Sequence, residues 1–461
     1  MKIIILLFLF TYLGGGICSS KTVYVSSSLG NDSYSGLSIE KPVKTIALAL
    51  TKGDTILLKA NDVFYSKGIV LKKKFLSRYN KGKNPVICGY KRIIKPKWVM
   101  MGRNIWRINL AEDNYTGVNL GGSSRSNNIG CLHEYDKDII HGRKVQHKSE
   151  LKDNWDIWQT DRFDKDTPAE EFDKLYLYFE DNPNKLKLEF SITDIAISME
   201  NASIDGVDFK GYGFGISAKS NTLIRNVGID AIGGRIQMGA KGFTCYGNGI
   251  EFWLGVQDCL VEKCIISRCY DSGCTIQGMS APAENIRFIN NIIVDCCQGW
   301  EDYISNEDQN VVFTNCVFEN NLVLNSGKTT GFGYTKGRFK YCHVLGNNYK
   351  GNKGMIMRNN TFVGGNFYCS GAYKGEYKSN IWKGNICYIK RGDFILSNCE
   401  GTKDVIRIPK EKGRFSSLNA ATNDAIRKYR ELTGDQTTKF VIMTDNKLER
   451  KINKLKKQNQ R

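Results

Sequence analysis

The sequence predicts an all-β fold, a solenoid of short parallel strands, and three observations support this prediction. From about residue 195 the chain repeats a loose phrase: a short apolar strand, Asn or Cys, a second apolar strand, and a Gly turn. One polar column runs through these repeats. Glycine is plentiful (46 residues) and proline is scarce (7 residues), as expected for many hydrogen-bonded strands joined by tight turns.

Six segments show the repeated phrase, with spacings mostly in the twenties to thirties of residues. They are LIRNVGID (223–230), LVEKCIIS (260–267), RFINNIIVD (287–295), VFENNLVLNSG (317–327), IMRNNTFVGG (356–365) and YKSNIWKGN (377–385). The shared column holds Asn226, Cys264, Asn291, Asn321, Asn360 and Asn380.

A parallel solenoid explains this pattern physically. One coil cannot enclose a core, whereas stacked coils share one. Asn at a fixed turn tolerates a left-handed backbone and bonds to its counterpart one coil away, with strands about 4.8 Å apart. A leucine-rich repeat would need a Leu consensus, and a propeller would need four strands per blade and a longer period. Neither is present.

Residues 1–20 have the features of a secretory signal peptide. Lys2 precedes an apolar run of 11 residues from Ile3 to Leu13, and small residues follow. This run is too short to span a membrane, so we expect cleavage near Ser19 or Ser20 and a secreted or periplasmic protein. Lipoprotein anchoring at Cys18 is less favoured, because Ile17 stands where a small residue is wanted. No later stretch is long and apolar enough to span a membrane.

Residues 22–50 read as a strand, a polar loop and a short helix. They resemble the opening of the secreted pectin-lyase-like, right-handed parallel β-helix superfamily. The residues that carry this resemblance are Tyr24, Val25, Ser26, Gly30, Asn31, Asp32, Gly36, Pro42, Thr45, Ile46, Ala49 and Leu50. The resemblance implies a right-handed parallel β-helix, with residues 21–99 forming an N-terminal cap and the first coils.

The middle and the end of the chain depart from the repeat. Residues 100–190 contain paired aromatics, LYLYF and an Asp-Asn-Pro turn, which predict an inserted antiparallel β-module of a kind found in glycan-active members of that superfamily. Residues 191–400 form the main β-helix. Residues 401–461 form a C-terminal cap, with a helix within 416–434 and a basic tail over 445–461 whose last residues are expected to fray.

The charge and the cysteines restrict the function only partly. The net charge is +19, which suits an acidic polysaccharide, an acidic surface or nucleic acid, although no nucleic-acid-binding motif is present. The simpler interpretation is a lysine-rich surface. Fourteen cysteines remain beyond Cys18, and their spacing fits neither a metal site nor a disulfide framework. We expect buried free thiols that fill the stack.

The segment NGIEFW (248–253) predicts the candidate active site. Strand alternation places Ile250 and Phe252 inward and Glu251 and Trp253 outward. In the next two coils, DSGCTIQG (271–278) and QGWEDYIS (298–305), the same alternation aligns Thr275 and Glu301 with Glu251. Two rungs separate the two glutamates by roughly 9–10 Å, near the upper end of the range for inverting glycosidases.

Further residues complete this candidate groove. Asp271 precedes the glycine of its coil, and we expect a bulge at Asp302 to aim that carboxylate outward. These carboxylates would supply a general acid and a general base, but the sequence does not say which is which. Further candidates are substrate-binding residues: Trp253, Gln277 and Tyr303 in the next outward row, and Arg235 and Lys241 in the Gly-rich stretch 233–248.

Other chemistries have weaker signals. Of the four histidines, His343 lies apart, and His133, His141 and His147 cluster in residues 130–150. A histidine of this cluster could reach the groove, but we expect surface roles for the three. No Ser-His-Asp order and no phosphate-binding loop is present. We expect no cofactor, with Asp205, Asp208 and Asp230 as the candidates should calcium bind, as in relatives of pectate lyase.

The resemblance implies a polysaccharide-degrading enzyme. The paired carboxylates favour a glycoside hydrolase. The basic residues keep a polysaccharide lyase open, in which Lys or Arg removes a proton beside a uronate. A non-catalytic glycan-binding or surface protein is the third alternative, because outward carboxylates on a solenoid are usually solvated. Substrate, linkage and oligomeric state do not follow from the sequence.

Overall fold

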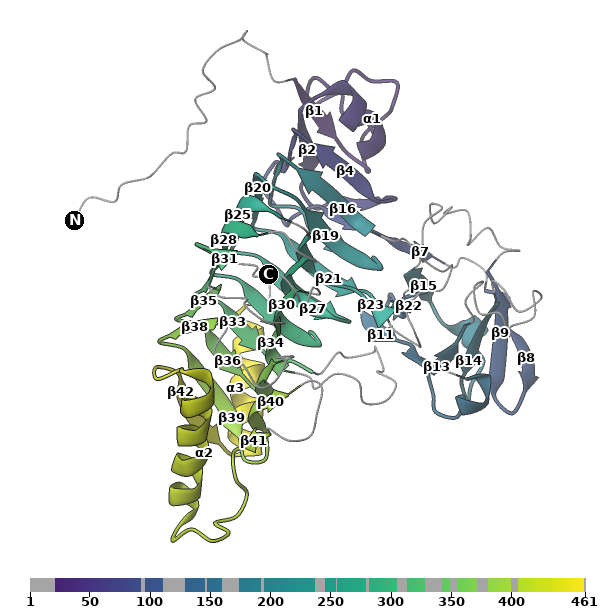
Figure 1. Cartoon of the computed structure of the whole chain (residues 1–461). Coiled ribbons are helices and arrows are strands. Elements are labelled where there is room, and N and C mark those ends of the chain that lie inside the picture. The colour runs from purple at the N-terminus through teal and green to yellow at the C-terminus, as the bar shows by residue number, and fades with distance from the viewer. Residues whose placement is uncertain are drawn as a thin grey trace, which may run out of the picture.

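A computed structural model describes most of the chain. The described residues are 21–92, 96–110, 129–145, 147–159, 174–191, 195–236, 245–253, 255–278, 282–304, 313–327, 342–348, 355–370, 380–398 and 405–459. Three long sheets run along one solenoid, and a smaller unit projects from its side (Figure 1). We call the three sheets A, B and C. Each coil contributes strands to them in this order before the next coil begins. This is the predicted parallel β-helix.

Sheet A is parallel and begins each coil. Its strands are β1 (Thr22–Val25), β2 (Thr55–Lys59), β5 (Phe75–Tyr79), β17 (Ser203–Asp205), β20 (Thr222–Arg225), β25 (Gln257–Glu262), β28 (Ala283–Ile289), β31 (Phe313–Thr314), β32 (Val317–Glu319), β35 (Met355–Arg358) and β38 (Asn380–Lys383).

Sheet B follows sheet A in each coil. Its strands are β3 (Val63–Tyr65), β6 (Val86–Cys88), β18 (Asp208–Lys210), β21 (Gly228–Ile232), β26 (Ile265–Cys269), β29 (Ile292–Val294), β33 (Leu322–Leu324), β36 (Thr361–Val363), β39 (Ile386–Lys390) and β42 (Lys439–Met443).

Sheet C completes each coil and carries the candidate site. Its strands are β4 (Ile69–Lys72), β16 (Ile195–Glu200), β19 (Phe214–Ala218), β24 (Ile250–Trp253), β27 (Ser272–Gly278), β30 (Gln298–Ile304), β34 (Cys342–Asn348), β37 (Asn366–Ser370), β40 (Phe394–Asn398) and β41 (Ile406–Arg407). Among the described strands of this sheet, β41 alone pairs antiparallel. A short hairpin of β22 (Arg235–Ile236) and β23 (Cys245–Tyr246) precedes β24.

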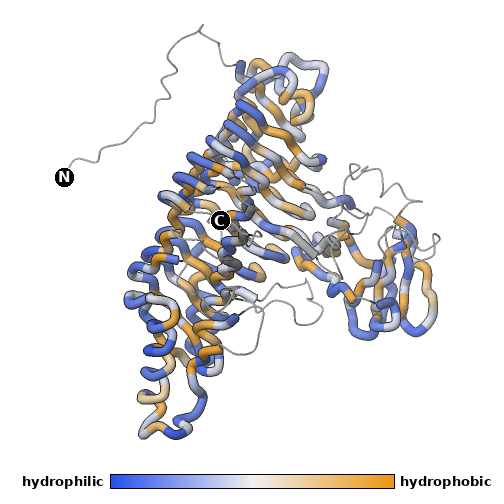
Figure 2. The backbone as a smooth tube through the Cα atoms, viewed as in Figure 1, coloured by the Kyte–Doolittle hydropathy of each residue, from blue (hydrophilic) through white to orange (hydrophobic). Residues whose placement is uncertain are grey.

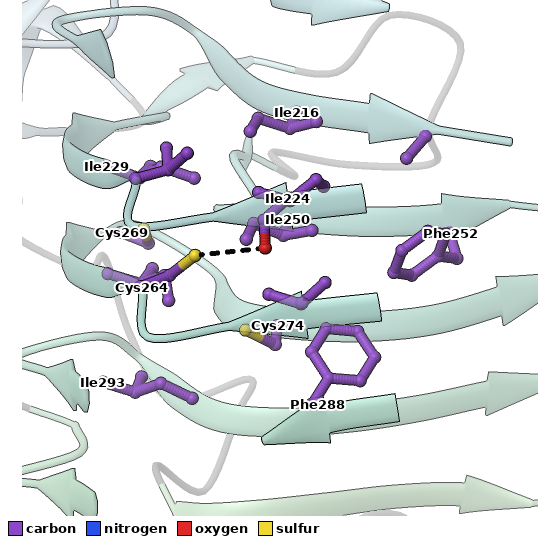
Figure 3. Close-up of a cluster of buried hydrophobic side chains, with 14 of the residues drawn as sticks. Ile216, Ile224, Ile229, Ile250, Phe252, Cys264, Cys269, Cys274, Phe288 and Ile293 are labelled. Carbon is purple, nitrogen blue, oxygen red and sulfur yellow. Dashed lines mark hydrogen bonds between the residues drawn. The ribbon is translucent and has the colours of Figure 1, made fainter. Parts of the chain in front are cut away.

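The inward side chains of the three sheets form one continuous core. Figure 3 shows part of it, where Ile216, Ile250 and Cys274 stack along sheet C. The colouring in Figure 2 alternates along the coils between hydrophobic and hydrophilic residues, as period-two strands require. The twelve cysteines whose side chains are described are all buried and free. As predicted, most of them fill the stack: the solenoid core contains Cys259, Cys264, Cys269, Cys274, Cys296, Cys316 and Cys387. The Cys264 thiol donates to the Ile224 carbonyl (Figure 3).

In the turn between sheets A and B, the left-handed residue and the residue that bonds to the next coil are two different residues, whereas the sequence pattern predicted that one residue has both roles. The first turn residue has a left-handed backbone, as at Asn226 (φ 53°) and Asn290 (φ 57°). The second turn residue carries the ladder, in which each side-chain oxygen accepts from the main-chain N–H of its counterpart one coil earlier. The ladder residues are Asn291, Asn321, Asn360 and Asn385. Asn226 and Asn380 were therefore assigned wrongly to this column.

Helices close both ends of the solenoid. Helix α1 (Ile46–Lys52) buries Ile46 and Ala49 against the first coils. Helix α2 (Leu418–Thr433) begins at Ser417, ends at Gly434 and places Tyr429 in the core. Among the described residues, no helix is long and apolar enough to cross a membrane.

Most of the basic tail forms a third helix, and its last two residues, where fraying was expected, lie outside the described residues. Helix α3 (Asp445–Gln458) packs Leu448 and Ile452 against Leu324 and Val363 on the outer face of sheet B. The amphipathic spacing of its few apolar residues explains why so basic a segment docks.

The inserted module lies between β6 and β16 and so begins at β7, about ten residues before the expected boundary at residue 100. Its first sheet contains β7 (Tyr90–Arg92), β10 (Leu132–Glu134), β11 (Ile139–His141) and β15 (Leu188–Ser191). Its second contains β8 (Val99–Gly102), β9 (Ile105–Asn109), β12 (Arg143–Lys144), β13 (Asp156–Trp158) and β14 (Lys174–Tyr178). Both sheets are antiparallel apart from the β12–β13 pair. The 3-10 helices η1 (Lys148–Glu150) and η3 (Pro183–Lys185) complete it.

A buried histidine joins the module to the solenoid. His133 lies between Glu189 (Nδ1 to Oε2, 3.1 Å) and Asp138 (Nε2 to Oδ1, 3.0 Å), and Asp138 pairs with Lys210 of sheet B at 2.5 Å. Burial opposes protonation of His133, but its hydrogen bonds with the two carboxylates outweigh burial and raise its pKa. The surface role expected for this residue is therefore wrong.

Candidate active site

The predicted outward row is present on sheet C. Glu251 of β24 pairs with Thr275 of β27, and Thr275 pairs with Glu301 of β30. The neighbouring inward column contains Cys274 and Trp300. Local alternation is enough to place the glutamates on one face, because a strand turns successive side chains to opposite sides.

Both glutamates are buried. Glu251 and Glu301 are each 8% exposed, so they are not the solvated surface carboxylates of the simpler interpretation. Trp253, in the next outward row, is 36% exposed. A partly open aromatic ring beside two buried carboxylates resembles the lining of a ligand site more than an ordinary surface.

Hydrogen bonds fix each glutamate differently. The Asn248 amide Nδ2 donates to Glu251 Oε2 at 2.6 Å. Glu301 Oε2 accepts from Ser272 Oγ at 2.7 Å and from Gln277 Nε2 at 3.0 Å. Gln277, predicted to bind substrate, therefore holds a carboxylate. Asn248 and Ser272 were not predicted as site residues, because their roles depend on contacts between coils.

The surroundings of Asp271 and Glu301 favour the protonated form of each carboxyl group. Burial raises the pKa of Asp271 to about 7. Burial also raises the pKa of Glu301 well above its ordinary value, and the nearby charges of Asp271, Glu251 and Asp302 raise it further. Like charges this close resist ionising together. The pair therefore retains a proton where an isolated carboxylic acid would lose it.

Asp302 does not point outward. It pairs in regular register with Ile276 of the preceding coil, without the expected bulge, and it is 0% exposed. Alternation alone places Asp302 in the inward column, and the prediction of a bulge was wrong. Its charge affects the site by raising the pKa of Glu301.

Three predicted binding residues are described only in part or not at all. Arg235 lies on β22 and Tyr303 on β30, where Tyr303 pairs with Gln277, but their side chains are outside the described residues. Lys241 lies wholly outside them.

The remaining candidates have protein partners of their own. Asp205 accepts from Arg225, Asp208 from the main chain of Gly228, and Asp230 from Ser267. Within the described ranges, no three His, Cys, Asp or Glu residues are grouped so that they could hold a metal ion. His343 is 0% exposed and forms a hydrogen bond of 2.9 Å with Ser326.

Comparisons with known proteins identify the fold. No family model and no curated protein matches the chain. Among solved structures, the complex of XylC with xylose is similar at 13% identity and a TM-score of 0.51, covering 82% of this chain and 69% of that one. This likeness supports the parallel β-helix fold.

Two further solved structures are more distant. The native GH136 lacto-N-biosidase from Eubacterium ramulus is similar at 10% identity and a TM-score of 0.32, covering 82% of this chain and 65% of that one. The pectate lyase Pel9A is similar at 15% identity and a TM-score of 0.31, covering 83% of this chain and 77% of that one.

Proposed function

We propose that this protein is a glycoside hydrolase that cleaves a polysaccharide over the outer face of sheet C. The observation that carries the proposal is the proton-retaining pair of the half-buried Asp271 and the buried Glu301, beside the amide-bound Glu251. Glycosidic cleavage needs one carboxylic acid that is still protonated at neutral pH and one carboxylate that is ionised. The fold family of XylC, whose structure holds xylose, is compatible with such a substrate.

The environments assign the two roles. Glu301, whose pKa is raised, protonates the glycosidic oxygen of the leaving group. Glu251 accepts a hydrogen bond from the amide nitrogen of Asn248, which can only donate, and such a donor favours the ionised form of a carboxylate. It removes a proton from the water that attacks the anomeric carbon. Two rungs separate the backbones by about 9.6 Å, which leaves room for that water and favours inversion.

The charge of the protein suggests the substrate class. A net charge of +19 raises the local concentration of polyanions, so we propose an acidic polysaccharide. The signal-peptide pattern of residues 1–20 further suggests that the protein meets it outside the cytoplasm.

The test is turnover of a panel of acidic and neutral polysaccharides by the full chain. We expect new reducing ends without the absorbance of an unsaturated uronate. Glu301→Gln and Glu251→Gln should each lower kcat by about 10²–10⁴-fold, whereas Glu284→Gln, at an exposed carboxylate on sheet A, should not. Unsaturated products would replace the hydrolase with a lyase, and binding without products would leave only a glycan-binding protein.

A further inference from the structure

Two hydrogen-bond donors converge on one oxygen of Glu301. Ser272 Oγ and Gln277 Nε2 both lie within 3.0 Å of Oε2. An amide nitrogen donates and never accepts, so Oε2 must accept. In a protonated carboxyl group the carbonyl oxygen is the better acceptor, and the proton therefore occupies the other oxygen.

The other glutamate, Glu251, accepts a hydrogen bond from the side-chain amide of Asn248. Its Oδ1 accepts from the Ser272 main-chain N–H at 3.1 Å, which fixes the orientation of the amide. Nδ2 must then face Glu251 Oε2. The main-chain carbonyl of Asn248 also accepts from the Gly215 N–H of the preceding coil at 2.9 Å, which fixes the backbone from which this side chain projects.

Ser272 is the residue that connects both contacts. Its main chain orients Asn248, and its side chain binds Glu301. Ser272 is 0% exposed and Asn248 is 4% exposed, so water does not compete strongly for these bonds. The chain Glu251–Asn248–Ser272–Glu301 thus links the two carboxylates across neighbouring coils.

We propose that Ser272 and Asn248 are positioning residues that set the protonation of the two glutamates: Ser272, with Gln277, directs the proton of Glu301 to Oε1, and Asn248 holds Glu251 ionised. This inference rests on the proposed hydrolase for its catalytic meaning. The location of the proton is a property of the protein alone and can be measured without a substrate.

Infrared difference spectroscopy of the full chain measures that location directly. A protonated Glu301 gives a carboxyl C=O band that Glu301→Gln removes. Ser272→Ala removes a hydrogen bond to the carbonyl oxygen, so this band should move to higher frequency. Gln277→Leu, at a less buried position of the same strand, should move it the same way and serves if Ser272→Ala fails to fold.

Thr275→Val is the matched control. Thr275 lies between these two residues on β27 and is 0% exposed, and its hydroxyl has no hydrogen-bond partner among the described residues. The band should stay in place in this variant. An unchanged band in both Ser272→Ala and Gln277→Leu, or a Glu301→Gln variant that removes no band, would overturn the proposal.

The pH profile of turnover provides the second readout. Activity falls as pH rises through the pKa of the acid, and Ser272→Ala removes a donor that lowers that pKa. The basic limb should move up by about one pH unit, with KM unchanged, and Ser272→Thr should restore it. Asn248→Ala should instead move the acidic limb up. If the limbs of the pH–activity profile stay in place in these variants, the positioning roles are contradicted. If the infrared band shifts but the protein has no turnover, only the proposed hydrolase activity is refuted.

Discussion

The asparagine ladder should contribute a large part of the stability of the solenoid, and Asn321→Leu tests this. Asn321 is 1% exposed. Its Oδ1 accepts from the main-chain N–H of Asn291 at 2.9 Å, and its Nδ2 donates to the Phe288 carbonyl at 3.0 Å. Leucine has a similar volume but makes neither bond. The change therefore leaves two buried polar groups of the preceding coil, the Asn291 N–H and the Phe288 carbonyl, without these partners.

The expected cost follows from those two contacts. A buried polar group that loses its hydrogen-bond partner costs about 1–3 kcal/mol. With two such groups, Asn321→Leu should lower the free energy of unfolding by about 2–6 kcal/mol. Asn380→Leu is the matched control, because Asn380 is also buried but neither side-chain atom has a hydrogen-bond partner among the described residues. Removing an unsatisfied amide should be neutral or slightly stabilising.

Urea unfolding followed by tryptophan fluorescence provides the comparison. The midpoint of Asn321→Leu should fall clearly below that of the wild type, and that of Asn380→Leu should stay level or rise. Equal losses in the two variants would refute the reasoning, because they would show that burial of an amide, rather than its ladder contacts, determines the cost.

Three further predictions follow from the site and the module. Glu301→Gln should stabilise the protein by at least about 1 kcal/mol at pH 8, and this gain should vanish near pH 4. A carboxyl group whose pKa is raised by folding destabilises the folded state once the pH rises above the pKa of the group in the unfolded chain. Thermal melts over a range of pH measure the difference. His133→Gln should destabilise the protein at pH 6, and the difference should disappear as pH rises through the raised folded pKa, where the wild type loses its charged contacts with two carboxylates; an equal loss at pH 9 would contradict it. Trp253→Ala should raise KM about fivefold to tenfold with little change in kcat if its ring stacks on sugar, and steady-state kinetics on the cleaved polysaccharide would show this.

Features that depend on short-period patterns, such as the face of a strand on which a side chain lies, were predicted well because the patterns are local. Period-two alternation placed Glu251 and Glu301 in one outward row with Thr275 between them. The same rule placed Asp302 inward, and the expectation failed only where a bulge was added to it.

Features that depend on another coil were predicted poorly. The asparagine column was misaligned at Asn226, which is the left-handed first residue of its turn, and at Asn380, which lies on β38 while Asn385 is the ladder residue of that coil. The roles of Asn248 and Ser272 were missed because each bonds a residue far away in sequence.

The sequence by itself determined the solenoid, its inward thiols and the face that carries the carboxylates, because each follows from alternation within a strand and from a turn pattern that recurs along the chain. Only the tertiary structure decided that Glu251 and Glu301 are buried, that Asp271 approaches Glu301, and which donors hold each oxygen. Burial and electrostatic coupling depend on which atoms lie within a few ångströms, and stacking, not the pattern of one coil, brings those atoms together.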